Sequence, residues 1–177
     1  MKTEDLKHVF YSGYDVSPDW EILDELSTLI NDGIIFYKKE EFYLKKNYYD
    51  LIDQVKTTEG LGPQGKGHMA LKEIAKEFLA EQGLESSTEP SFLGAHPDIL
   101  SKDFSWIVEC GTTVPVSILF FLRDERIKNI GILPYPYEDE KKLTLHVFSR
   151  GKNFDQHVTS RIVRLRTAFE KFHRKSS

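Results

Sequence analysis

Two acidic residues, Asp98 and Glu109, are the side chains of this sequence best placed for chemistry. Asp98 lies in Ala-His-Pro-Asp-Ile-Leu, at the end of one predicted strand, and Glu109 lies in Trp-Ile-Val-Glu-Cys-Gly, at the end of the next. Eleven residues separate them, which is the length of one β-hairpin. Two antiparallel strands joined by a tight turn would therefore place the two carboxylates side by side.

The segment before Glu109 indicates that this carboxylate is buried. Trp106-Ile-Val108 predicts a strand that is covered on both faces. A buried carboxylate is costly unless a cation pairs with it. A divalent metal ion held by both acids meets that need, and a structural salt bridge meets it equally well, so the residues leave both alternatives open.

The order of elements and the short motif resemble the PD-(D/E)XK, or restriction-endonuclease-like, nuclease superfamily. Pro97-Asp98 matches the first half of the motif, and Glu109-Cys110-Gly111 matches the second half except at Gly111, where the family normally has lysine. The resemblance covers roughly residues 66–150. It implies an α/β (α+β) fold with a restriction-endonuclease-like core, a central mixed sheet flanked by helices. It also implies Asp98 and Glu109 as metal ligands and Mg²⁺ or Mn²⁺ as cofactor.

The lysine that Gly111 replaces helps the family to activate water and to stabilise the pentavalent phosphate. The predicted helix over residues 68–82 offers a substitute, because at 100° per residue His68 projects to its buried side and Lys72 lies at the edge of that side. The first helix packs beside the catalytic hairpin in nucleases of this type. We therefore expect His68 and Lys72, one turn apart, to face Asp98 and Glu109. The alternatives are a polar helix N-terminus for His68 and a solvated flank for Lys72.

The charge of the chain is divided unevenly. Residues 150–177 carry eight Lys or Arg and two acids, whereas the other 149 residues carry 16 bases and 26 acids. A basic tail on an acidic body suggests an anionic partner. Lys152, Arg161 and Arg164 are the candidates for contacts to a nucleic-acid backbone; the alternative is a solvated helix face.

The sequence divides into a small module over residues 1–48, a connector with a Gly-rich hinge over 49–67, and a nuclease-like domain with a basic C-terminal helix over 68–177. In the module we expect a helix from Ser17-Pro18 and a hairpin over residues 34–44. Residues 17–46 weakly resemble part of a winged helix. Its candidate recognition helix, Trp20–Asn31, is acidic, which favours packing or contact with a protein or a second copy over DNA binding.

Beyond the hinge the pattern predicts strands over residues 92–100, 104–110, 129–133 and 143–148. Pro115 precedes a predicted helix over residues 116–123, and apolar residues from Phe154 onwards mark a last amphipathic helix.

Composition excludes several classes of protein. The chain of 177 residues is 40% hydrophobic and 29% charged, which is the globular range. Its longest apolar run has nine residues, too short to cross a bilayer, and no signal peptide is visible at the N-terminus. The single cysteine, Cys110, excludes an internal disulfide framework. We expect an intracellular (cytoplasmic) protein that does not bind membranes.

Three functions are compatible with the sequence, and two of them are favoured. The first is a Mg²⁺- or Mn²⁺-dependent nuclease that hydrolyses DNA, with RNA also a candidate substrate and with Asp98, Glu109, Lys72 and His68 in the catalytic site. The second is a catalytically degenerate pseudo-nuclease that binds nucleic acid or a protein. The retained acids favour the first, whereas Gly111 and the acidic body favour the second. A winged-helix regulator is a third possibility, which the acidic candidate helix disfavours.

Overall fold

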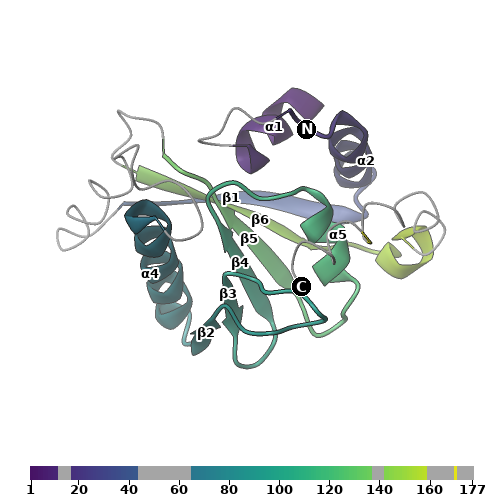
Figure 1. The fold of residues 1–177 in the computed structure, drawn as a ribbon. Helices are drawn as coiled ribbons and strands as arrows, with labels where there is room; N and C mark the ends of the chain where they lie inside the picture. Colours follow the sequence, from purple (N-terminus) through teal and green to yellow (C-terminus); the bar gives the residue numbers. More distant parts are fainter. Residues whose placement is uncertain (12–16, 44–64, 137–141, 159–169, 171–177) are drawn as a thin grey trace.

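The computed structural model describes residues 1–11, 17–43, 65–136, 142–158 and 170 (Figure 1). Its helices and strands, in chain order, are α1 (Thr3–Phe10), α2 (Trp20–Asn31), β1 (Ile35–Tyr43), α4 (Lys66–Glu81), β2 (Ser86–Thr88), β3 (Ile99–Ser101), β4 (Trp106–Cys110), α5 (Val116–Leu122), β5 (Asn129–Leu133) and β6 (Lys142–Arg150).

The strands form one mixed six-stranded sheet in the order β1-β6-β5-β4-β3-β2. Strands β2, β3 and β4 are an antiparallel meander, and α5 then connects β4 to β5, which runs parallel to β4. A parallel neighbour requires such a crossover, because a tight turn can join only antiparallel strands. Strands β6 and β1 extend the sheet beyond β5, each antiparallel to its neighbour.

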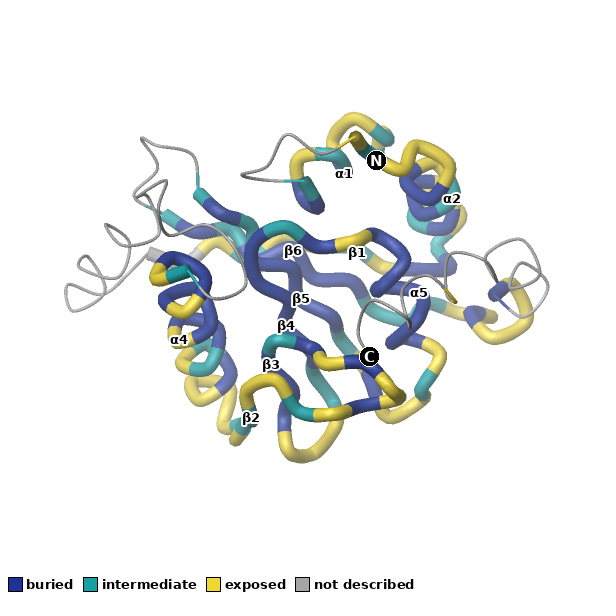
Figure 2. The backbone as a smooth tube through the Cα atoms, in the orientation of Figure 1, coloured by how far each residue is buried: buried dark blue, intermediate teal, exposed yellow. Residues whose placement is uncertain are grey.

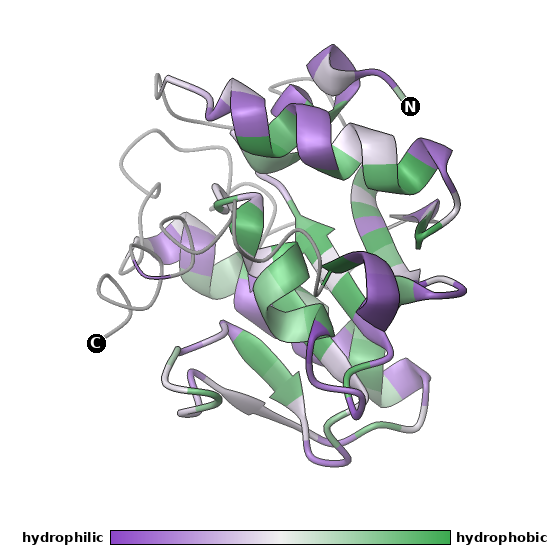
Figure 3. Ribbon diagram, turned by 90° about the vertical axis from the view of Figure 1, so that its right-hand side faces the viewer, coloured by the Kyte–Doolittle hydropathy of each residue, from purple (hydrophilic) through white to green (hydrophobic). Residues whose placement is uncertain are grey.

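Helices cover both faces of this sheet (Figures 1 and 3). Helix α4 packs on one face, where Leu71 and Leu79 join a cluster with Val108 and Cys110 of β4. Helices α1, α2 and α5 cover the opposite face, in a second cluster that includes Ile107 of β4. Buried residues accordingly run through the central strands, and exposed residues lie on the outer turns of the helices (Figure 2).

Four predicted elements of the core are confirmed. The helix predicted over 68–82 is α4, which ends before Gly83, a residue with φ +77° as expected for glycine after a helix C-terminus. The predicted segments 116–123 and 129–133 are α5 and β5. The strand predicted over 143–148 is β6, which is longer by one residue at its start and two at its end.

The hairpin expected over residues 34–44 is wrong, because Ile35–Tyr43 is one continuous strand. Its central Lys-Lys-Glu-Glu contains no Gly, Asn or Pro, the residues that a tight turn favours. All nine residues of β1 pair with β6, so the N-terminal module contributes a strand to the same sheet as residues 86–150. The charges of β1 lie on a sheet edge, where they discourage pairing with other chains.

Several element boundaries also differ from the predictions. The strand predicted over 92–100 is shorter, since only Ile99–Ser101 is regular and residues 92 and 95 form an isolated bridge. The strand expected from Phe104 starts at Trp106, because Phe104 has φ +61° and belongs to the turn. Helix α2 is capped by Asp19, whose carboxylate accepts from Ile22 N–H, and not by Ser17. Strand β2 was not predicted.

Part of the predicted organisation lies outside the described residues, including most of the 49–67 connector and most of the last helix, of which residues 154–158 are described as helical. Among the described residues, no helix combines the length and the apolar character needed to cross a membrane.

Candidate active site at the ends of strands β3 and β4

The two acids predicted to lie side by side are brought together at one end of the β3–β4 pair. Ile99 pairs with Val108, so the antiparallel register places Asp98 opposite Glu109. The Asp98 backbone N–H donates to Glu109 Oε2 at 3.1 Å, and the Cys110 backbone N–H donates to Asp98 Oδ2 at 2.8 Å. Each carboxylate is therefore held by the backbone of the other strand.

Helix α4 supplies two basic side chains to this pair of acids. His68 Nε2 and Lys72 Nζ each lie 3.0 Å from Asp98 Oδ1. The two residues are one helical turn apart, so both reach the same carboxylate oxygen. Helical geometry predicts Lys72 at the edge of the buried side of the helix. In the structure its side chain is only 7% exposed, so Lys72 is buried.

A third acid, Glu89, contacts the same lysine and was not identified from the sequence. Its Oε1 lies 2.5 Å from Lys72 Nζ, while its side chain is 60% exposed. Glu89 follows β2 with φ +49°, and its backbone N–H donates to the Asp98 carbonyl oxygen at 2.9 Å. In the sequence Glu89 lies in a short polar stretch with no periodic pattern, so only the tertiary structure shows its place.

The environment shifts the pKa values of Glu109, Asp98 and Lys72. Complete burial, followed by the nearby charge of Asp98, raises the pKa of Glu109 well above its usual value. Burial opposes the ionised form of Asp98, but the hydrogen bond and charge of His68, the Cys110 N–H and the charge of Lys72 outweigh it and lower the pKa of Asp98. Burial also opposes the charge on Lys72, but contacts with Glu89 and Asp98 raise its pKa overall. The unlike environments therefore favour a neutral Glu109 beside an ionised Asp98.

Two features of the structure require glycine at position 111, where the motif would have lysine. Its φ is +73°, and a Cβ atom there would lie 2.5 Å from the Tyr135 ring. The Tyr135 hydroxyl in turn lies 3.4 Å from His68 Nδ1. A lysine at position 111 would thus need a different backbone and a displaced tyrosine, whereas Lys72 reaches Asp98 from α4 without either.

The carboxylates of Asp98 and Glu109 are the candidate ligands for a divalent cation. Within the part of the chain that the structure describes, no group of three or more His, Cys, Asp or Glu is arranged to hold a metal ion. Two carboxylates still suit Mg²⁺, which keeps several waters and is commonly bound through one or two carboxylates together with substrate phosphates. The donor set therefore fits Mg²⁺ or Mn²⁺ on condition that Glu109 loses its proton.

The remaining candidates lie apart from this cluster or cannot be placed. Lys152 is exposed in the turn after β6, while Arg161 and Arg164 lie outside the described residues. His96, two residues before Asp98, is exposed in a segment that is not a strand. Cys110 is buried, and burial followed by the charges of Asp98 and Glu109 raises the pKa of its thiol, which disfavours a nucleophilic thiolate.

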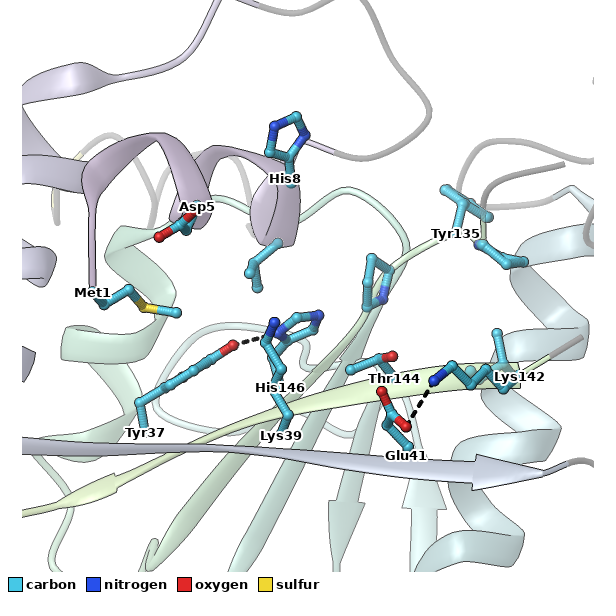
Figure 4. Close-up of a pocket in the computed structure, with 14 residues that line it drawn as sticks. Met1, Asp5, His8, Tyr37, Lys39, Glu41, Tyr135, Lys142, Thr144 and His146 are labelled. Carbon is cyan, nitrogen blue, oxygen red and sulfur yellow. Dashed lines mark hydrogen bonds and ion pairs between the residues drawn. The ribbon is translucent and has the colours of Figure 1, made fainter. Parts of the chain in front are cut away.

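A separate hollow of about 700 Å³ opens beside this cluster, between α1, strands β1 and β6, and the segment after β5 (Figure 4). Tyr135 is common to both places, because it lines the hollow and its hydroxyl lies beside His68.

Comparison of the chain with protein-family models, with curated proteins and with solved structures gave no match.

Proposed function

We propose that this protein is a metal-dependent nuclease of the PD-(D/E)XK type that hydrolyses phosphodiester bonds of DNA. The observation that carries the proposal is the position of Lys72 Nζ, 3.0 Å from Asp98 Oδ1, in a chain whose motif has Gly111 in place of lysine. The succession α4-β2-β3-β4-α5-β5, with an antiparallel meander and then a parallel strand, supports it as the arrangement expected of a restriction-endonuclease-like core.

Each residue of the cluster has a task in this chemistry. Asp98 and Glu109 would hold the cation, which when bound supplies an activated water and neutralises charge on the phosphate. Lys72 places a positive charge where negative charge develops during phosphoryl transfer. His68 holds Asp98 Oδ1 through Nε2 and lies beside the Tyr135 hydroxyl through Nδ1, so it fixes the orientation of the aspartate.

One observation favours the second candidate function, a pseudo-nuclease that binds nucleic acid or a protein without cutting. Lys72 is already paired with Asp98 and Glu89, and the pKa of Glu109 is raised, so these residues form an ion-pair network that needs no metal ion or substrate. Such networks also occur as purely structural features.

Hydrolysis assays on the full chain separate the two functions. Plasmid, linear, single-stranded DNA and RNA substrates are incubated with Mg²⁺ or Mn²⁺, and wild type is compared with Asp98→Asn. Glu73→Gln, an exposed acid of α4 paired with Lys76, is the matched control. Cleavage by wild type and by the control, lost in Asp98→Asn, supports the nuclease. Absence of cleavage with every metal and substrate, together with retained nucleic-acid binding, supports the pseudo-nuclease.

A further inference from the structure

The hollow beside the candidate active site has the size of a small-molecule site. Its volume of about 700 Å³ lies within the ~300–1,000 Å³ range of ligand pockets. Residues of α1 form one wall, residues of β1 and β6 form the floor, and Pro134–Pro136 close one side (Figure 4). Its lining combines aromatic, charged and apolar side chains, and nothing in the proposed chemistry of Asp98 and Glu109 uses it.

Strand register places the floor of this hollow in the same row of the sheet as Glu109. Glu109 pairs with Ile132, Ile132 pairs with His146, and His146 pairs with Lys39. Directly paired residues point to the same face of a sheet, so all four side chains share one face. Neighbouring strands lie about 5 Å apart, which puts the backbone of His146 roughly 10 Å from that of Glu109. If a nucleic-acid strand is bound at Glu109, the hollow therefore lies about one or two nucleotides further along that strand.

The part of the floor that Tyr37 and His146 form is polar but uncharged at neutral pH. Tyr37 OH and His146 Nδ1 lie 2.8 Å apart, and the two rings stack with centroids 6.1 Å apart. Burial, followed by the charge of Lys39, lowers the pKa of His146 to about 4. The neutral pair thus presents the partly exposed ring of Tyr37, with the buried His146 beside it, and such a surface suits a neutral heterocycle better than an ion.

The rim carries charges of both signs. Lys142 pairs with Glu41 at 2.8 Å on the strand side, whereas Asp5 lies on the α1 side and accepts the backbone N–H of Lys2 at 3.2 Å. Lys39 has no ion-pair partner within the described part of the chain. The neutral Tyr37–His146 pair below a lysine that is in no ion pair among the described residues matches a ligand that joins a heterocycle to an anion.

From these contacts we propose that the hollow binds one nucleotide, with its base on the Tyr37–His146 pair and its phosphate at Lys39. Resting on the proposed function, this nucleotide is the unit of the DNA strand next to the phosphodiester held at Asp98 and Glu109. The hollow is thus a subsite that fixes the strand relative to the reacting bond, and Tyr135 is the wall between the subsite and the candidate catalytic cluster.

The test is binding of dAMP to the full chain in EDTA, measured by calorimetry and by ring-proton NMR of Tyr37 and His146. Deoxyadenosine and deoxyribose 5-phosphate are titrated as the two halves of the ligand. The variants are Lys39→Ala, Thr144→Phe, which fills the hollow from β6, and Lys38→Ala as matched control. Lys38 neighbours Lys39 on β1, but its side chain alternates to the opposite face and contacts Glu40.

We expect dAMP to bind more tightly than either half and to shift the Tyr37 and His146 signals. Lys39→Ala should weaken dAMP binding about tenfold, the loss typical of one charge-assisted contact, and leave deoxyadenosine unaffected. Lys38→Ala should change neither affinity, and Thr144→Phe should abolish both while the melting temperature is retained. Absence of dAMP binding overturns the proposal, as do equal effects of Lys38→Ala and Lys39→Ala or equal affinities for dAMP and deoxyribose 5-phosphate.

The measurement separates failure of the subsite from failure of the nuclease, because it needs neither metal nor hydrolysis. Binding of dAMP by Asp98→Asn, with no cleavage by wild type, would retain the subsite and reject the nuclease. Cleavage of DNA by wild type, without binding of dAMP, would retain the nuclease and reject the subsite.

Discussion

Lys72 and Asp98 form a nearly buried ion pair with Nζ and Oδ1 3.0 Å apart, although 26 residues separate them and they belong to different layers of the fold. The pair connects helix α4 to the end of the β3–β4 meander. It places one cation among three carboxylates, since Glu89 contacts Lys72 directly and the charge of Lys72 acts on Glu109.

Replacement of Lys72 tests its part in the proposed chemistry. Lys72→Met should lower turnover by two or more orders of magnitude, as loss of one electrostatic stabiliser typically does. Lys76→Met is the control, because Lys76 lies one turn further along α4 and pairs with the exposed Glu73. Because Lys72 is buried, its loss should also lower the free energy of unfolding, by about 1–3 kcal/mol. Full activity of Lys72→Met in a folded protein would contradict the role of Lys72.

Removal of the charge of Glu89 should strengthen anion binding at Lys72. Glu89 is the most exposed of the lysine's partners and competes with a phosphate for the same Nζ. Glu89→Gln should therefore tighten the binding of short oligonucleotides several-fold in Ca²⁺ or EDTA. Glu85→Gln makes the same charge change in an exposed pair with Lys102, so an equal gain in both variants would indicate only a change in net charge.

Glu109→Gln should separate metal binding from stability. The raised pKa favours the neutral form of Glu109 without metal, and glutamine resembles that form, so the free energy of unfolding should change by less than about 1 kcal/mol. Glu109→Gln should abolish Mn²⁺ binding measured by calorimetry, and Asp98→Ala should do the same. In wild type the Mn²⁺ affinity should rise with pH, because metal binding must displace the proton of Glu109. Mn²⁺ binding that survives both substitutions would place the site elsewhere.

Gly111→Ala should cost more stability than Gly83→Ala. Both glycines have positive φ, +73° and +77°, so each alanine carries a similar backbone strain of about 1–2 kcal/mol. A Cβ at Gly83 meets nothing within 4 Å, whereas a Cβ at Gly111 meets the Tyr135 ring at 2.5 Å. Urea unfolding of both variants measures the difference. Restoring the motif lysine with Gly111→Lys should accordingly destabilise the protein and yield no gain of activity; equal costs for the two alanine variants would refute the clash with Tyr135.

His146 should make the protein less stable in mild acid. Its pKa is lowered to about 4 in the folded chain from an ordinary value of 6.5. Between these two values the unfolded chain binds a proton that the folded chain does not, so stability falls as pH falls. The loss from pH 7 to pH 5 should be about 2 kcal/mol. Glutamine does not titrate, so the free energy of unfolding of His146→Gln should fall by about 2 kcal/mol less than that of wild type between pH 7 and pH 5. Urea unfolding at the two pH values measures this difference. An equal fall in both proteins would contradict the lowered pKa of His146.

Local sequence patterns were sufficient to predict the elements that build the candidate site. Helical periodicity and Gly83 defined α4, and the hairpin spacing put Asp98 opposite Glu109. Helical geometry also brought His68 and Lys72 to the same acid. These predictions depended on residues close in sequence, or on one turn between two strands, where local geometry decides the outcome.

Features set by distant contacts could not be predicted in the same way. Helical geometry predicts Lys72 at the edge of the buried side of α4, and only the positions of Asp98 and Glu89 explain why its side chain is buried. Two apolar runs separated by four charged residues suggested a hairpin over residues 34–44, and the pairing of β6 with the whole length of β1 shows a single strand instead. The hollow beside Tyr135 arises where α1 meets the sheet, and no local pattern encodes such a junction.

The pairing of β1 with β6 also constrains how the chain acquires its structure during synthesis. Ile35 pairs with Arg150 and Tyr43 pairs with Lys142, so each residue of β1 pairs with a residue about one hundred positions downstream. At the usual 5–20 residues per second, translation of that interval takes roughly 5–20 s. The aromatic and charged edge of β1 is without its partner strand for that time. The β1 edge of the sheet can be completed only after nearly all of the described chain has left the ribosome.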